Sequence, residues 1–190
     1  LTGGQTLQGR ELTVPGDISA AAFALIAGAL LPEAEISFAN IGLNPTRTGI
    51  LEVLIQMGAD LTISQSSPQV SAEEEPMGTL QVRGGKRLKG CEIGGSIIPR
   101  LIDELPVICV AAAAAQGKAV IREAEELRVK ESDRITATAD MLTAFGAEVE
   151  EQPDGLIIYG GRPFKSARID SRGDHRIAMA AAVAGLVGEG

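Results

Sequence analysis

Two cations and two carboxylates lie within five consecutive residues of the stretch LRVKESDRI at 127–135, namely Lys130, Glu131, Asp133 and Arg134. Lys130 and Arg134 are four residues apart, so on a helix their side chains would share one face. Glu131 would then point about 100° away from that face. Such a group could form half of an active site, or it could be a solvated helix start with internal ion pairs. The stretch by itself favours the second interpretation.

A second group of polar residues lies in the segment SRGDHRIAMA at 171–180. Gly173 permits close approach of the backbone, and Arg176 offers a planar, bidentate donor to a carboxylate or phosphate. His175 is the single histidine of the chain. A lone histidine near a helix start more often bonds to the backbone than takes part in catalysis. Its neighbours Asp174 and Arg176 nevertheless indicate a site, in which His175 would have a supporting role.

This second group belongs to a repeated pattern in which an Asp precedes an Ala-rich apolar stretch. The three copies begin at Asp17, Asp103 and Asp174. Each predicts a buried helix with the Asp at or near its N-cap, where a carboxylate accepts bonds from unpaired backbone N–H groups. N-capping would explain Asp103 fully, and only an additional partner would indicate a base. Three aligned helix starts could also converge on an anion.

The first two copies continue alike, which predicts a repeated α/β unit. After each Ala-rich helix we expect a strand, an amphipathic helix and another strand. The expected segments are EISFANI, TRTGILEVLIQMGAD and LTIS in the first copy, and AVIREAE, SDRITATADMLTAFGAE and GLIIYG in the second. The stretch QSSPQVSAEEEPMG at 65–78 predicts an exposed loop or hairpin connection. The third copy is expected to be cut off in the middle of its unit.

Composition excludes several classes of protein. The 190 residues are 45% hydrophobic, enough for a sizeable core in one domain. The longest apolar run, Leu105 to Ala115, is well short of the roughly 20 residues that cross a bilayer. A net charge of −8 without a local basic patch argues against nucleic acid binding. The spacing of Cys91 and Cys109 does not fit a metal site. Interpreted as free thiols, they indicate a reducing compartment. The start at Leu1, without a signal peptide, predicts a piece of a longer protein.

Taken together, three motifs strongly resemble the 5-enolpyruvylshikimate-3-phosphate (EPSP) synthase family of aromatic amino acid synthesis. They are RLIDELP at 100–106, RVKESDRI at 128–135 and GDHRIAMA at 173–180, and their order and intervals match. VPGDISAAAF at 14–23 fits the same family, so the resemblance runs along essentially the whole chain. It implies an α/β fold, the enolpyruvyl transferase fold, of repeated βαβαββ units with buried helices and outer sheets. Residues 1–190 would be most of the C-terminal domain of a two-domain enzyme, with the third unit truncated and the N-terminal domain absent.

The resemblance also implies a reaction and roles for residues. The family joins the 5-hydroxyl of shikimate 3-phosphate to C2 of phosphoenolpyruvate, and the adduct then loses phosphate. By resemblance, Asp103 would accept the hydroxyl proton and Glu131 would handle the proton at C3. Arg134 and Arg176 would clamp phosphoenolpyruvate, and Lys130 would lie between the substrates and bind shikimate 3-phosphate. The opening stretch would then be half of an active site.

Three further residues are assigned to the same site. Glu126 stands where some members offer a side-chain amide to shikimate 3-phosphate, and Asp174 and His175 would have supporting roles. No metal or organic cofactor is implied. We expect the parent enzyme to be a cytoplasmic monomer, and this chain alone to be inactive, because the shikimate phosphate pocket belongs to the absent domain.

Two alternatives stay open on the sequence. One is the related transferase that acts on UDP-N-acetylglucosamine, although the pair KESDR and GDHR favours the shikimate enzyme. The other is a non-catalytic α/β module that binds small anions or another chain, in which the polar motifs would be helix caps and ion pairs.

Overall fold

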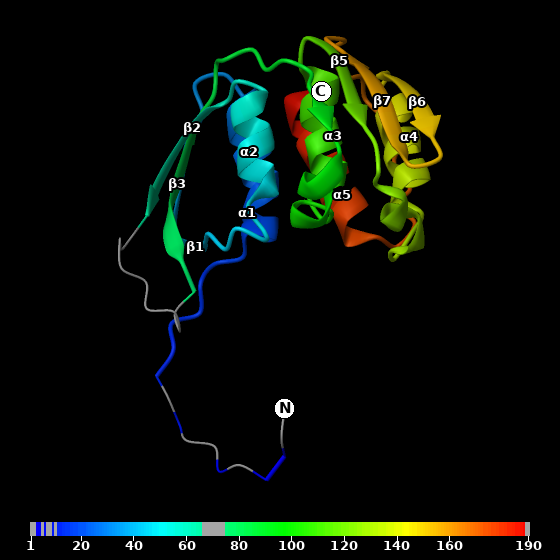
Figure 1. The fold of residues 1–190 in the computed structure, drawn as a ribbon. Coiled ribbons are helices and arrows are strands. Elements are labelled where there is room, and N and C mark those ends of the chain that lie inside the picture. The colour runs from blue at the N-terminus through cyan, green and yellow to red at the C-terminus, as the bar shows by residue number, and fades with distance from the viewer. Residues whose placement is uncertain (1–2, 5, 7–8, 10, 66–74, 189–190) are drawn as a thin grey trace.

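The computed structural model describes residues 3–4, 6, 9, 11–65 and 75–188, and it places helices between two sheets (Figure 1). In chain order the helices, 3-10 turns (η) and strands are α1 (Ile18–Leu30), β1 (Glu35–Gly42), α2 (Gly49–Gln56), β2 (Asp60–Gln65), β3 (Met77–Arg83), β4 (Glu92–Ile93), η1 (Gly95–Arg100), α3 (Leu105–Ala114), β5 (Gly117–Ile121), η2 (Glu125–Val129), α4 (Arg134–Ala144), β6 (Glu148–Gln152), β7 (Gly155–Gly160) and α5 (His175–Val187).

Two sheets form the outer layers. In the first, β3 lies between β1 and β2, and both pairs are antiparallel. In the second the order is β4-β5-β7-β6, with β4 and β5 parallel and the other pairs antiparallel. Helices α1, α3 and α5 lie between the sheets, while α2 packs on β2 and α4 packs on β6 (Figure 1).

The predicted repeat is confirmed in its topology. The elements β4, α3, β5, α4, β6 and β7 form one complete βαβαββ unit. In the first unit an isolated parallel bridge between Gly16 and Ile41 takes the place of the β4·β5 pair, and α1, β1, α2, β2 and β3 follow. Strands β4 and β6 were not among the segments expected from the repeat, and neither was β3. Strand β3 is the antiparallel neighbour of β2, as a hairpin connection at 65–78 requires, although 66–74 lie outside the described residues.

The Ala-rich helices form the centre of the core. Most residues of α1 and all but the last of α3 are buried, as expected for helices that are apolar on every side. Small side chains let α1, α3 and α5 pack against one another. Helix α5 departs from the expected full burial, because Met179 is 39% and Leu186 60% exposed.

The stretch at 127–135 is not one helix, which corrects the expected shared face of Lys130 and Arg134. Turn η2 ends at Val129, Lys130 is extended, and α4 begins only at Arg134. Asp133 is the N-cap of α4 and accepts a bond from the Thr136 backbone N–H. A strong cap three residues after Lys130 therefore separates the two cations into different elements.

The described part of the chain has no helix that is both long and apolar enough to span a membrane.

Gly155 tests the close packing of the second sheet. A Cβ at Gly155 would lie 2.0 Å from the backbone oxygen of Ile121. We expect Gly155→Ala to lower the free energy of unfolding by about 1–3 kcal/mol, because the strands must separate. Gly185→Ala in α5 is the control. A Cβ there meets nothing within 4 Å, and the substitution should stabilise by up to about 1 kcal/mol. Urea unfolding followed by circular dichroism measures both, and equal effects would contradict this account.

Candidate active site

The N-termini of α1, α3 and α5 lie at the same end of the molecule (Figure 1). Two of the three predicted aspartate caps are confirmed. Asp17 accepts bonds from the backbone N–H groups of Ser19 (3.0 Å) and Ala20 (3.2 Å), and Asp174 accepts one from Arg176 (2.9 Å). These caps satisfy donors that a helix start would otherwise leave unpaired.

Asp103 lies next to the N-cap of the second copy, as expected, but it is not itself the cap. The N-cap of α3 is Glu104, and it makes no side-chain cap bond. A cap accepts from the second or third helical residue, and the second is Pro106, which has no N–H. The Asp103 carboxylate instead contacts Arg134 and Arg176. These are the additional partners that would indicate a role as a base.

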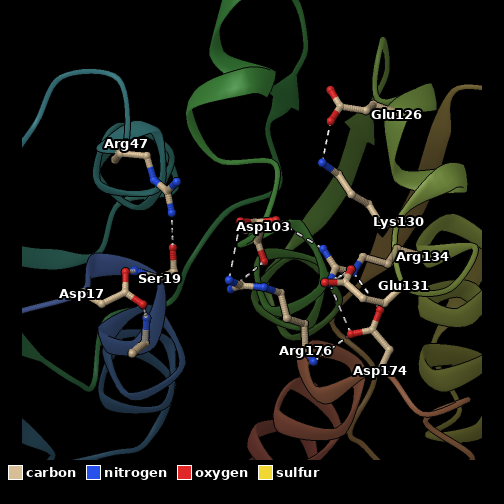
Figure 2. A network of polar contacts seen from close by, with 11 residues as sticks. Asp17, Ser19, Arg47, Asp103, Glu126, Lys130, Glu131, Arg134, Asp174 and Arg176 are labelled. Carbon is tan, nitrogen blue, oxygen red and sulfur yellow. Dashed lines mark hydrogen bonds and ion pairs between the residues drawn. The ribbon is translucent and has the colours of Figure 1, made fainter. Parts of the chain in front are cut away.

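Arg134 occupies the centre of the site (Figure 2). Its side chain is only 1% exposed. Nε donates to Asp174 Oδ2 at 2.8 Å, Nη2 donates to Glu131 Oε2 at 2.6 Å, and Nη1 donates to Asp103 Oδ1 at 3.3 Å. A longer bond of 3.4 Å joins Nη2 to Asp174 Oδ1. Three carboxylates from three segments therefore surround one buried guanidinium.

Asp174 forms a buried ion pair with Arg134 and neutralises its charge. Its carboxylate is fully buried and also accepts from the Ser132 hydroxyl at 3.0 Å. Burial by itself would raise the pKa of Asp174, but the hydrogen bonds from Arg134 and from the Arg176 backbone outweigh it and hold that pKa below its ordinary value. Burial likewise opposes the charge of Arg134, and the bond to Asp174 overcomes it, so the pKa of Arg134 is raised. Both groups stay charged.

Asp103 lies between the two arginines (Figure 2). Its Oδ2 is 3.5 Å from Nη2 of Arg176, and its backbone oxygen accepts from Nη1 of Arg176 at 3.3 Å. The Arg176 side chain is 14% exposed and that of Asp103 28%, so both are more open than Arg134. The motifs at 100–106, 128–135 and 173–180 thus meet in space.

The remaining predicted residues lie at the edge of this cluster. Lys130 forms an ion pair with Glu126 and does not contact Arg134 (Figure 2). The Glu131 side chain is 55% exposed, although it bonds to Arg134. His175 is exposed, and no side-chain hydrogen bond of His175 is found within the described residues. No cluster of three or more His, Cys, Asp or Glu in the described ranges is arranged to hold a metal ion.

Glu104 lies within the motif at 100–106 but was assigned no role from the sequence. It is 2% exposed, and its Oε1 has no hydrogen-bond partner in the described structure. Burial raises the pKa of Glu104, and the nearby Ser19 side chain and the charges of Arg176 and Arg47 only partly oppose this shift. Ser19 accepts a bond from Arg47 at 2.9 Å, so this polar chain links the first unit to the site. Its position next to Asp103 is the only signal that the sequence carries.

Comparison with known proteins shows the family of this chain. The model of the family described as EPSP synthase (3-phosphoshikimate 1-carboxyvinyltransferase) matches residues 1–190. The chain belongs to the EPSP synthase family. A 3-phosphoshikimate 1-carboxyvinyltransferase of Pelotomaculum thermopropionicum is 56% identical over 97% of the chain. The chain spans 42% of the length of that relative.

Solved structures support the same fold. An EPSP synthase from Acinetobacter baumannii is 42% identical and superposes with a TM-score of 0.91, over the whole chain and 44% of that protein. The enolpyruvyl transferase NikO from Streptomyces tendae, at 20% identity, has a TM-score of 0.68 over 93% of the chain and 38% of NikO, which shows the fold alone. The predicted enolpyruvyl transferase fold is confirmed, and the family match does not favour the nucleotide-sugar alternative.

Removal of the charge on Asp174 tests the buried ion pair. We expect Asp174→Asn to lower the free energy of unfolding by about 3–5 kcal/mol at neutral pH, because Arg134 keeps a buried charge without its main partner. Asp140→Asn is the matched control, since Asp140 pairs with Arg172 at the surface and should cost at most about 1 kcal/mol. Urea titration of both variants measures the difference, and a similar loss in each would show that the buried pair has no special weight.

Glu104 tests the cost of a buried carboxyl without full partners. The pKa of Glu104 is higher in the folded than in the unfolded state. The protonated carboxyl therefore contributes to stability below the unfolded-state pKa, and this contribution is lost as pH rises through the folded-state pKa. Glu104→Gln should therefore be more stable than the native protein at pH 7, by about 1 kcal/mol, and this advantage should shrink toward about pH 4. Exposed Glu125→Gln is the control. Thermal unfolding across this pH range would contradict the account if the advantage were constant.

Proposed function

We propose that the protein containing this chain transfers the enolpyruvyl group of phosphoenolpyruvate to the 5-hydroxyl of shikimate 3-phosphate and releases phosphate. The family match over the whole chain supports this reaction. The observation that carries the proposal is the bridging position of Asp103, whose carboxylate lies against both Arg134 and Arg176. At this position a proton acceptor lies beside two groups that can bind an anion.

The proposed chemistry is an addition with two proton transfers, followed by an elimination with a third. The 5-hydroxyl oxygen attacks C2 of phosphoenolpyruvate, Asp103 accepts the hydroxyl proton, and Glu131 donates a proton to C3. This addition yields a tetrahedral adduct with a methyl group. Elimination then breaks the bond between C2 and the phosphate oxygen, while the methyl group loses a proton and the enol double bond forms again.

The arginines would bind the negative charge of phosphoenolpyruvate. Arg176 is partly exposed and makes only long contacts of 3.3 and 3.5 Å with Asp103, so its donors are available to a planar anion. Arg134 keeps its bond to Asp174 and would exchange the bonds to Asp103 and Glu131 for bonds to substrate. That exchange would free both carboxylates for proton transfer. A carboxylate that leaves an arginine in a dry cleft binds a proton more readily.

The other assigned residues would bind or support. Lys130, whose side chain is 25% exposed, would contact shikimate 3-phosphate from the edge of the cluster. Glu126 holds Lys130 through an ion pair and cannot donate a hydrogen bond to substrate when ionised. Asp174 would fix Arg134, and we keep His175 as a supporting residue at the start of α5.

The rest of the site would come from the rest of the protein. The chain spans 42–44% of the length of the two EPSP synthases described above. We propose that residues 1–190 are most of the C-terminal domain, and that an N-terminal domain supplies the shikimate phosphate pocket and closes over the cluster. The whole protein would act as a monomer in the cytoplasm, with these two substrates and no cofactor.

Phosphate release tests the proposed reaction. We expect the full-length protein to release inorganic phosphate only when phosphoenolpyruvate and shikimate 3-phosphate are both present. Glu131→Gln should lower kcat by about 100-fold to 10,000-fold, because the amide cannot donate a proton in the same way. Glu125→Gln, at an exposed position in η2, should keep the native rate.

Two results would refute the proposal. One is a folded full-length protein that releases no phosphate from the substrate pair. The other is release that does not require shikimate 3-phosphate.

A further inference from the structure

The short segment 129–133 carries two of the proposed site residues but has little packing of its own. It joins η2 to α4 and includes Lys130 and Glu131. Val129 is 80% exposed, and the Glu131 side chain is 55% exposed. The nearest buried apolar side chains, Leu127 and Ile135, lie outside the segment on either side and are 4% and 0% exposed. Within the segment, Glu131 bonds to Arg134 and Ser132 bonds to Asp174. The start of the segment is held by a further interaction.

Arg128 supplies that interaction through the hairpin of β6 and β7. Its Nε donates to the backbone oxygen of Pro153 at 2.7 Å, and its Nη2 donates to that of Gln152 at 2.6 Å. Nη1 donates to Glu151 Oε1 at 3.0 Å. These three bonds attach the start of the segment to the second sheet.

The same guanidinium also reaches the far end of the segment. Nη1 of Arg128 donates to Asp133 Oδ2 at 2.9 Å and, more weakly, to Thr136 Oγ1 at 3.4 Å. Asp133 is the N-cap of α4, whose first residue is the central Arg134. Arg128 thus joins both ends of the segment to one hairpin, and residues 129–132 form the loop between them.

Arg128 and Asp133 both favour their charged forms, which stabilises the contact between them. The hydrogen bonds with Glu151 and Asp133 raise the pKa of Arg128. Burial alone would raise the pKa of Asp133, but the Thr136 backbone bond and Arg128 outweigh it and lower that pKa. The pair is therefore charged throughout the neutral range. Only a planar group with five donors can serve these acceptors together, so lysine is not an equivalent.

We propose that Arg128 is a positioning residue, which holds Lys130 and Glu131 in the geometry that the reaction requires. It acts through the segment 129–133 and touches neither substrate. Because proton transfer to C3 depends on the placement of Glu131, a small displacement of this segment lowers the rate of the chemical step. This inference rests on the proposed function.

The experiment compares Arg128→Lys and Arg128→Gln with the native full-length protein. We expect kcat to fall about tenfold to a hundredfold in both variants, while KM for phosphoenolpyruvate changes less than threefold, because misplaced groups slow chemistry more than they weaken binding. Arg162→Lys is the control, since Arg162 pairs with Glu148 in the same sheet, away from the segment. The assay temperature lies below the unfolding transition of every variant, which separates the rate from stability.

Amide order parameters from ¹⁵N relaxation give a second readout that does not depend on activity. In Arg128→Lys, values at Lys130 and Glu131 should fall from about 0.85 toward 0.6, while α4 stays rigid. A kcat within twofold of native, or unchanged order at both residues, would overturn the inference. If the native protein did not turn over the substrate pair, the proposed function would fail, and the order parameters would still decide whether Arg128 holds the segment.

Discussion

The buried ion pair between Arg134 and Asp174 is the contact on which the arrangement of the site depends. The two side chains are 1% and 0% exposed, and they belong to the starts of α4 and α5. Two charges are costly to bury, so the pair is tolerable only with good geometry and further hydrogen bonds. Ser132 and the Arg176 backbone provide those bonds to Asp174. The ends of two helices are therefore held in one relative position.

The packing of the helices makes that position possible. Alanine-rich surfaces let α1, α3 and α5 approach closely, and the parallel order of the repeated units brings their N-termini to one end of the core. The second and third units then add polar residues to this end. Asp103 comes from the start of α3, Arg134 from the start of α4, and Arg176 from the start of α5. The repeat thus explains why residues far apart in the chain form one cluster.

Where the sequence was a good guide, the signals were local or periodic. The apolar stretches after Asp17 and Asp174 predicted capped helices, because capping depends on neighbouring residues, and the first of these helices is buried as expected. Where the sequence was a poor guide, a contact between distant residues or the effect of one neighbouring residue determined the local structure. Lys130 and Arg134 would share one face of a helix, but Asp133 caps a helix that begins only at Arg134. Asp103 lies next to a cap as expected, but no local pattern indicated that its carboxylate would contact two arginines.

The sequence alone determined the α/β class, the repeated unit, the residues of the three motifs and the resemblance to one family. These features depend on amino-acid composition, on the periodicity of apolar residues and on the order of the motifs along the chain. It did not determine which charges would be buried or which carboxylate would bond to which arginine. Only the tertiary structure decided that Arg134 is enclosed, that Asp174 is its main partner, that Glu104 is buried without full partners, and that Arg128 joins both ends of its segment to a hairpin. The physical reason is that burial and ion pairing depend on groups brought together from distant parts of the chain, and no local pattern specifies their distances.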